Sequence, residues 1–349
     1  MVFVYVRTHQ IPTPPPLTQE QIEEQNKIAW VTEKIASMSA EEKAGQMLIW
    51  HIEEKELSSA SAKLLTDIPF GGIIIMGNHT KESIKKLVDQ INALPALVPR
   101  FIAIDQEGGL VKRLTDDPNP GAAALSNVSS EEFCETYKKT TQLLKDAGVN
   151  MNFGIVADIG WFADGFISAR TFGRNARLVS DLVGQAATCS SGIVTAVKHF
   201  PGHGRTKLDS HKTIPVIKTP YDEWKTTDAL PFEIAINKNV PVIMLGHLMY
   251  EQMASEPASL SLFWIQKLRD MGHKGLIITD DLGMLEKGGM NIEEIVEKAL
   301  GAGADMLLFV NTKADPKTIF LNMQKSQSPE TIKQSLYRIL EWKYEMRKK

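Results

Sequence analysis

Short, fully apolar runs alternate along this chain with longer stretches in which apolar residues recur at helical spacing. Apolar runs without alternation are typical of parallel strands that are buried on both faces. Eight such runs are present: Gln46–His51, Gly71–Met76, Phe101–Ile104, Met151–Asp158, Thr195–His199, Pro241–Leu245, Gly275–Thr279 and Ala304–Val310. We therefore expect a parallel sheet that is covered by helices.

The helical stretches fill the intervals between these runs. A polar helix is expected over Gln19–Ser37, and Ser39 with Glu42 three residues later forms a capping box for a second, short helix. Amphipathic helices are expected over Lys81–Leu94, Glu131–Asp146, Arg177–Ser191, Tyr221–Asn237, Leu262–Met271 and Ile292–Leu300, and a closing helix over Thr331–Arg347. Eight repeats predict the α/β class with a single (β/α)8 TIM-type barrel. A doubly wound open sheet is the main alternative, but no GxGxxG follows an early strand.

The chain divides into a Pro-rich N-terminal tail, residues 1–17, and a barrel domain, residues 18–349. The net charge is −3 and no basic block points to nucleic acid as a partner. No apolar run reaches the roughly 18 residues that span a bilayer. The N-terminus lacks a basic segment before its short apolar stretch, so we expect a cytoplasmic protein, with export as the alternative if an upstream signal has been lost.

The two cysteines, Cys134 and Cys189, belong to no CxxC or other ligand-spaced pattern. The sequence thus indicates neither a zinc site nor a disulfide framework. We expect two reduced cysteines on helices, and a pair between them stays open.

Polar residues follow the predicted strands where those strands end. Because a barrel gathers the carboxyl ends of its strands on one face, these side chains are expected around one pocket. They are Asp105, Asp158, Lys198, His199, His247, Asp280, Asp281 and Asn311.

The densest chemistry lies in residues 198–211, which read KHFPGHG, four further residues, and Asp-Ser-His. This run holds three of the eight histidines and follows a Val-rich strand. It resembles, without a gap, the signature of bacterial β-N-acetylglucosaminidases of glycoside hydrolase family 3. Further segments extend the resemblance over roughly Met38 to Val310.

The resemblance implies which residues carry out catalysis. The first aspartate of a TDDL-type motif, Asp280, is the expected nucleophile, and Asp281 can cap the helix that follows. The expected acid/base is His211, held by Asp209, because imidazole titrates near neutrality and a carboxylate two residues away can orient it. Members of this type are thought to carry this dyad on a mobile loop, and Gly202, Gly204 and Ser210 suit that mobility.

The same resemblance assigns sugar-binding roles. Lys198 and His199 are expected to contact hydroxyls of the sugar, with Asp105, Arg113 and Arg170 as further contacts. The segment from Asp105 follows the pattern DQEGGxVxR, except that Leu110 stands where the family often has Arg. A planar guanidinium suits a vicinal diol. His203 and His247 are expected either to contact substrate or to support the residues that do.

The implied activity is that of a hydrolase, an exo-acting, retaining β-N-acetylhexosaminidase. It would release terminal GlcNAc from peptidoglycan fragments, which points to cell-wall recycling, or from chitooligosaccharides. We expect no metal and no cofactor, a small carbohydrate as the binding partner and a monomer. No motif identifies the residues that recognise the 2-acetamido group or the natural aglycone.

Several alternatives stay open. A β-glucosidase or β-xylosidase of the same family usually takes its acid/base from a further C-terminal domain, which the Asp209–His211 dyad makes unnecessary. A GlcNAc phosphorylase is a second alternative, since a neutral histidine does not repel phosphate. A metal-dependent hydrolase barrel would use ligands from the set His199, His203, His211, Asp209 and Asp280, but the first two lie on a Pro/Gly-broken loop.

Overall fold

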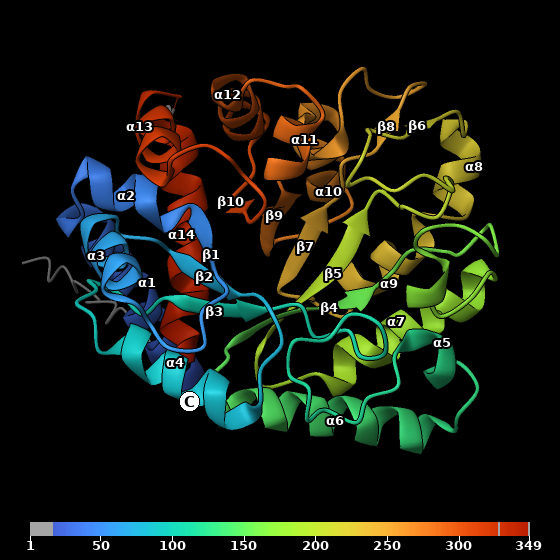
Figure 1. The fold of residues 1–349 in the computed structure, drawn as a ribbon, viewed down its shortest axis with the longest axis horizontal. Helices are drawn as coiled ribbons and strands as arrows, with labels where there is room; N and C mark the ends of the chain where they lie inside the picture. The colour runs from blue at the N-terminus through green and yellow to red at the C-terminus, as the bar shows by residue number, and fades with distance from the viewer. Residues whose placement is uncertain (1–16, 327–328, 348–349) are drawn as a thin grey trace, which may run out of the picture.

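A computed structural model describes residues 17–326 and 329–347 of the chain. Eight parallel strands close into a barrel in the order β1-β10-β9-β7-β5-β4-β3-β2, and Figure 1 shows them at the centre of the molecule with helices around them. The strands are β1 Leu48–Ile52, β2 Gly72–Ile75, β3 Phe101–Ile104, β4 Met151–Val156, β5 Val194–Phe200, β7 Val242–Leu245, β9 Leu276–Asp281 and β10 Met306–Phe309. This arrangement confirms the predicted (β/α)8 barrel.

Each predicted apolar run became one barrel strand for a simple reason. Successive side chains of a strand point to opposite faces. In β2 and β3 every residue is buried, so one set of side chains fills the barrel and the other packs under the helices. The last pairing, Trp50 of β1 beside Phe309 of β10, closes the sheet and leaves no edge strand.

Helices cover the barrel on the outside. They are α1 Gln19–Ser37, α2 Ala40–Gln46, α3 Ser59–Asp67, α4 Lys81–Asn92, α5 Ala122–Leu125, α6 Ser130–Asp146, α7 Ala176–Cys189, α8 Tyr221–Thr226, α9 Leu230–Asn237, α10 Leu262–Asp270, α11 Gly283–Lys287, α12 Ile292–Ala302, α13 Pro316–Ser326 and α14 Pro329–Met346. The predicted capping box is present at α2, where Ser39 and Glu42 each accept from the other's backbone N–H.

The structure corrects the prediction in the long stretch Tyr221–Asn237. It is not one helix but two, α8 and α9, which are separated by Thr227–Ala229. Pro231 stands in the first turn of α9, where its missing N–H costs nothing but where it cannot continue an earlier helix. No sequence pattern predicted the small parallel pair β6 Val216–Ile217 and β8 Met249–Tyr250, which follows β5 and β7 in the chain.

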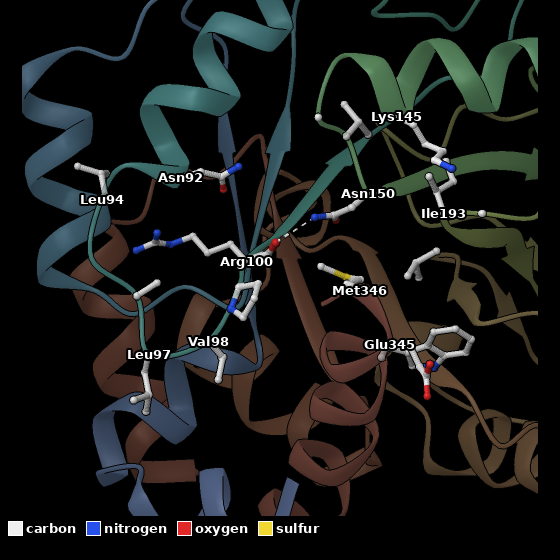
Figure 2. Close-up of a pocket in the computed structure, with 17 residues that line it drawn as sticks. Asn92, Leu94, Leu97, Val98, Arg100, Lys145, Asn150, Ile193, Glu345 and Met346 are labelled. Carbon is white, nitrogen blue, oxygen red and sulfur yellow. Dashed lines mark hydrogen bonds between the residues drawn. The ribbon is translucent and has the colours of Figure 1, made fainter. Parts of the chain in front are cut away.

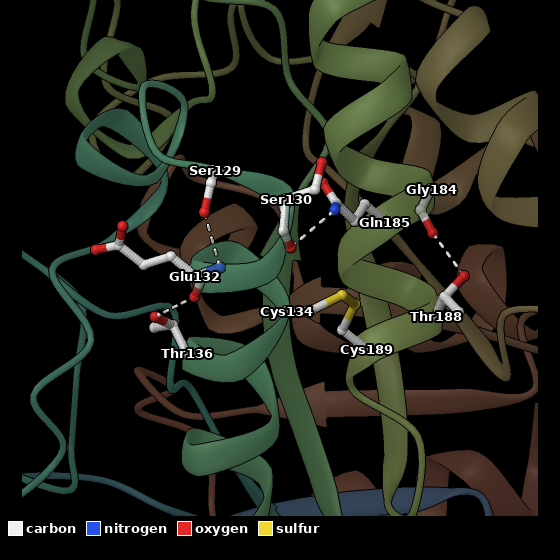
Figure 3. The surroundings of a disulfide bond; sticks show 9 residues. All are labelled: Ser129, Ser130, Glu132, Cys134, Thr136, Gly184, Gln185, Thr188 and Cys189. Carbon is white, nitrogen blue, oxygen red and sulfur yellow. Dashed lines mark hydrogen bonds between the residues drawn. A yellow bond between two sulfur atoms is a disulfide. The ribbon is translucent and has the colours of Figure 1, made fainter.

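The expectation of two reduced cysteines was wrong. Cys134 on α6 and Cys189 on α7 form a disulfide across two neighbouring helices, with their Cα atoms 5.2 Å apart (Figure 3). The two cysteines are 55 residues apart in the sequence, and only the packing of α6 beside α7 brings them together. Spacing along the chain therefore carried no signal.

Removing this disulfide should destabilise the fold. The crosslink reduces the number of conformations open to the unfolded chain. The Cys134→Ser/Cys189→Ser double variant should therefore lose about 2–4 kcal/mol of unfolding free energy. Urea denaturation with and without reductant measures this loss. The unmodified protein should become less stable in reductant, whereas the double variant should not respond. A midpoint in the unmodified protein that is insensitive to reductant would contradict the crosslink.

A cavity of about 570 Å³ lies at the amino-terminal end of the barrel. Arg100, Asn150 and Ile193, which directly precede β3, β4 and β5, line it together with Trp342 and Met346 of α14. Figure 2 shows the Asn150 side chain donating to the backbone oxygen of Arg100. This cavity is at the end of the barrel opposite the predicted polar residues, so the chemistry has to be sought at the other end.

The described residues include no helix that is long and apolar enough to cross a membrane. The predicted Pro-rich tail, residues 1–17, lies outside the described residues except for Leu17. The division into tail and barrel domain stays a prediction.

Candidate active site

A buried cluster of ion pairs forms at the carboxyl ends of β3 and β5. The ammonium of Lys198 lies 2.8 Å from Asp105 Oδ1 and 2.7 Å from Glu107 Oε1. Arg170 binds Glu107 through two hydrogen bonds, from Nε at 2.9 Å and from Nη2 at 2.7 Å. Arg113 approaches Asp105 at 3.8 Å. The structure thus brings together four of the predicted sugar-binding residues, which share one network.

Glu107 is the centre of this network, and no role was predicted for it from the sequence. Burial opposes its ionisation, but the charges of Lys198 and Arg170 outweigh burial and lower its pKa to about 2. Burial lowers the pKa of Lys198, but the negative charges of Asp105 and Glu107 raise it by more. The net result is a pKa above the ordinary value. The cluster therefore holds fixed charges near neutral pH, with donors and acceptors that suit hydroxyl groups. The only feature of the sequence that could have indicated a role for Glu107 was its place in the DQEGG run, two residues after Asp105.

Asp280 lies at the end of β9, half-buried, with its Oδ1 accepting from the Asp281 N–H at 2.8 Å. Burial raises the pKa of Asp280, but electrostatic interactions with the His199 and His247 rings and with Lys198, together with this hydrogen bond, lower it to about 2. Its other oxygen, Oδ2, accepts no hydrogen bond from any described residue. Asp280 therefore presents an ionised carboxylate with one oxygen available for attack, which is what a nucleophile requires.

Asp281 binds neighbouring backbone segments together at this strand end. Its carboxylate accepts from the N–H groups of Gly283, Val310 and Asn311 at 3.0, 2.8 and 3.0 Å. Asp281 thus binds the start of α11 to the end of β10, which frees Asp280 from a capping role. His247 supports the same turn by donating from Nε2 to the Asp281 backbone oxygen at 2.8 Å, with Ser259 on its Nδ1. His247 is therefore a supporting residue rather than one that faces a ligand.

His199 is oriented by Asp158, which lies at the end of β4 and is fully buried. The ring Nδ1 of His199 is 2.7 Å from Asp158 Oδ2, and the His203 N–H donates to Asp158 Oδ1 at 2.6 Å. One carboxylate thus fixes both a predicted sugar contact and the start of the following loop. Burial raises the pKa of Asp158, but the interactions with His199 and His203 together have the larger, opposite effect. The net result is a pKa below the ordinary value, so Asp158 stays ionised. The sequence placed Asp158 at a strand end without indicating this role.

The predicted dyad is present on the loop after β5. His211 Nδ1 is 2.8 Å from Asp209 Oδ1, which also accepts the His211 backbone N–H at 3.0 Å. Burial raises the pKa of Asp209, but these two hydrogen bonds lower it, so the carboxylate is ionised. With Nδ1 donating to Asp209, the outer nitrogen Nε2 is available for proton transfer. The side chain of His211 is 52% exposed.

Contacts of Arg205 and His203 hold the loop that carries the dyad. Arg205 Nε donates to Asp228 at 2.8 Å, and its guanidinium lies 4.1 Å above the Trp161 ring. His203 Nε2 and the Ser210 hydroxyl are 2.9 Å apart. Gly204 is required by close packing rather than by mobility, since a Cβ there would lie 1.6 Å from the Ile159 oxygen. Among the described residues, no hydrogen bond joins Asp209 or His211 to Asp280, Lys198 or His199.

The described side chains at this end of the barrel are not grouped as a metal site requires. Within residues 17–326 and 329–347, no three His, Cys, Asp or Glu side chains are arranged to hold a metal ion. The alternative of a metal-dependent hydrolase therefore gains no support from this geometry, and activity in the presence of a chelator is its test.

One family model and several curated proteins are similar to this chain. The family model described as "Glycosyl hydrolase family 3 N terminal domain" matches residues 39–341. A curated β-hexosaminidase of Thioalkalivibrio sulfidiphilus is 33% identical over 302 residues, which cover 80% of this chain and 85% of that protein. A β-hexosaminidase of Neisseria gonorrhoeae is 31% identical over 274 residues, covering 73% and 75% of the two chains.

Among solved structures, a family 3 β-N-acetylglucosaminidase from Paenibacillus sp. superposes with a TM-score of 0.83 at 29% identity. The match covers 88% of this chain and 62% of that one, so this chain spans less than two thirds of the Paenibacillus protein.

Proposed function

This chain belongs to glycosyl hydrolase family 3, and we propose that it releases terminal, non-reducing GlcNAc from short glycans by a retaining, exo-acting mechanism. As a member of the family it is a glycoside hydrolase. The observation that carries the proposal is an ionised Asp280 with Oδ2 available, at the same barrel end as the Lys198–Asp105–Glu107–Arg170 network and the Asp209–His211 dyad. The relatives named β-hexosaminidase support GlcNAc as the sugar that is released.

In the proposed substrate complex, hydroxyls of the terminal sugar are bound by Lys198, Asp105, Arg113, Arg170 and His199. The network is buried and already paired, so the substrate meets groups that need little rearrangement. Asp158 keeps the His199 ring in place from behind. These contacts position the anomeric carbon against the Asp280 carboxylate.

In the first step, an oxygen of Asp280 attacks the anomeric carbon as the bond from that carbon to the leaving oxygen breaks. His211 gives its Nε2 proton to the leaving oxygen, and a glycosyl ester of Asp280 forms. Asp209 stabilises the imidazolium before this transfer and orients the neutral ring after it.

In the second step, the neutral His211 accepts a proton from water, and the water oxygen attacks the anomeric carbon. The ester bond breaks, Asp280 leaves as a carboxylate, and GlcNAc is released with the original β configuration. His211 thus loses one proton to the leaving oxygen in the first step and regains one from water in the second, so the cycle ends with the enzyme in its starting state.

Two chromogenic substrates test the proposal. p-Nitrophenyl β-GlcNAc should be hydrolysed, p-nitrophenyl β-glucoside should not, and a chelator should leave the rate unchanged. Release from the glucoside alone would overturn the assignment of the sugar in favour of a β-glucosidase, and loss of activity with chelator would favour the metal-dependent alternative. Faster sugar release in the presence of inorganic phosphate, with GlcNAc 1-phosphate as product, would make the enzyme a phosphorylase instead.

For the natural substrate we propose peptidoglycan fragments or chitooligosaccharides, and for the assembly a monomer. For the compartment, the Cys134–Cys189 disulfide favours the exported alternative over the cytoplasm, because disulfides persist in oxidising compartments. Thiol alkylation in intact cells would reveal whether the two cysteines are paired there.

A further inference from the structure

An exposed phenylalanine lies beside the proton donor. Phe166, on the loop between β4 and α7, is 36% exposed. Its ring centroid is 5.5 Å from that of His211, with an angle of 66° between the planes, and 5.8 Å from that of His203. A single exposed apolar residue is ordinary on a protein surface. A phenyl ring in contact with the imidazole that is proposed to protonate the leaving group calls for a functional explanation.

The backbone around Phe166 is well fixed. The Gly165 N–H donates to the Phe162 oxygen at 3.1 Å, and the Ser168 N–H donates to the Gly165 oxygen at 3.0 Å. The next residue, Ile167, is buried, and Arg170 is bound to Glu107 in the central network. The loop that carries Phe166 also carries Arg170 of the sugar-binding network, while the partly exposed Phe166 ring contacts His203 and His211 of the dyad loop.

The chemistry of the reaction tells which part of the substrate this ring meets. The proton donor has to reach the glycosidic oxygen, and beyond that oxygen lies the aglycone. A side chain in contact with the donor and open to solvent therefore borders the aglycone rather than the terminal sugar. The C–H face of a sugar ring, or an aryl ring, is what a phenyl side chain packs against best.

We propose that Phe166 forms an apolar wall of the aglycone subsite, so that the enzyme favours leaving groups that present a ring face, such as a second pyranose. This inference rests on the proposed function and names the class of aglycone that the sequence left open.

Phe162 on the same loop provides a matched control. It is 38% exposed, almost the same as Phe166. Its ring instead faces the ammonium of Lys207 at 5.5 Å, and Lys207 in turn binds Asp164 at 2.7 Å. No ring contact joins Phe162 to His211 among the described residues. Loss of Phe162 should therefore remove the same kind of surface without changing the aglycone subsite.

The test compares two leaving groups of similar acidity, of which only one is a ring: phenyl β-GlcNAc and hexafluoroisopropyl β-GlcNAc. For Phe166→Ala, kcat/KM on the phenyl glycoside should fall by about tenfold, which corresponds to part of one ring face losing its contact. On the hexafluoroisopropyl glycoside, kcat/KM should stay close to that of the unmodified enzyme. Phe166→Trp should retain the preference, and Phe162→Ala should affect neither substrate.

Three results would overturn the inference. Equal losses on both glycosides, with a shifted pH profile, would mean that Phe166 positions His211 instead of contacting the aglycone. Equal effects of Phe162→Ala and Phe166→Ala would mean that the loop acts as a whole. An unchanged preference in Phe166→Ala would mean that the ring does not contact the leaving group. Failure of the proposed function itself would be distinguishable, because the unmodified enzyme would then turn over neither GlcNAc glycoside.

Discussion

Asp280→Asn is expected to lower kcat on β-GlcNAc glycosides by on the order of 10⁴–10⁶-fold, the range typical of a lost nucleophile. Asparagine keeps the shape of the side chain and removes the charge that attacks the anomeric carbon. The pKa of Asp280 is lowered to about 2, so the carboxylate of the unmodified enzyme is ionised at every pH above that value. Any loss of activity between pH 6 and pH 4 is therefore expected to come from another group.

Chemical rescue makes this prediction specific. In Asp280→Ala the nucleophile is replaced by a small space, and added azide should restore turnover by attacking from the same side. The product should be the α-glycosyl azide, since a single displacement inverts the configuration at the anomeric carbon. Thermal unfolding shows whether the variants are folded. If Asp280→Asn kept near-normal activity while folded, Asp280 would not be the nucleophile and the two-step mechanism would be wrong.

His211→Ala is expected to lower kcat by about 10²–10⁴-fold, because the same imidazole serves as acid in the first step and as base in the second. The loss in the first step should be larger for chitobiose than for p-nitrophenyl β-GlcNAc, since a sugar alkoxide needs a proton far more than p-nitrophenolate does. Asp209→Asn should lower activity in the same way, and the double variant should be little worse than His211→Ala alone, because the two residues act as a unit.

Lys207 offers the matched control for the dyad. It lies in the same loop, its side chain is 54% exposed, and its ion pair is with Asp164 rather than with either member of the dyad. Lys207→Ala should behave like the unmodified enzyme on both substrates. If His211→Ala hydrolysed chitobiose as well as Lys207→Ala does, His211 would not be the acid/base, and the proton donor would have to be sought among other residues at this barrel end.

The fold was predictable from the sequence because its strands carry an unambiguous pattern. Runs such as GIII in β2 and FIAI in β3 are short and apolar throughout, which is typical of strands that are buried on both faces. Helix boundaries were less certain where a local residue interrupts a periodic stretch, as Pro231 does between α8 and α9. The Cys134–Cys189 pairing could not be predicted, because it depends on how two helices pack.

The candidate site was predictable to the extent that its residues follow strand ends or lie in the run from Lys198 to His211. Glu107 was missed although it stands two residues after Asp105, because its role depends on two cations, Lys198 and Arg170, that arrive from distant parts of the chain. Phe166 was missed for a similar reason. An exposed phenylalanine in a loop has no sequence signature, and only its contact with His211 gives it meaning.

The most direct test of the mechanism is to trap the intermediate on the enzyme. The protein is incubated with the 5-fluoro derivative of GlcNAc β-fluoride. This compound forms a glycosyl-enzyme quickly, and that glycosyl-enzyme is hydrolysed slowly. The mass of the intact protein is then measured, and the labelled peptide is identified. The mechanism predicts a mass increase of one fluorinated GlcNAc unit, located on Asp280 and absent in Asp280→Asn. A label on any other residue, or turnover of the compound without labelling of the enzyme, would contradict it.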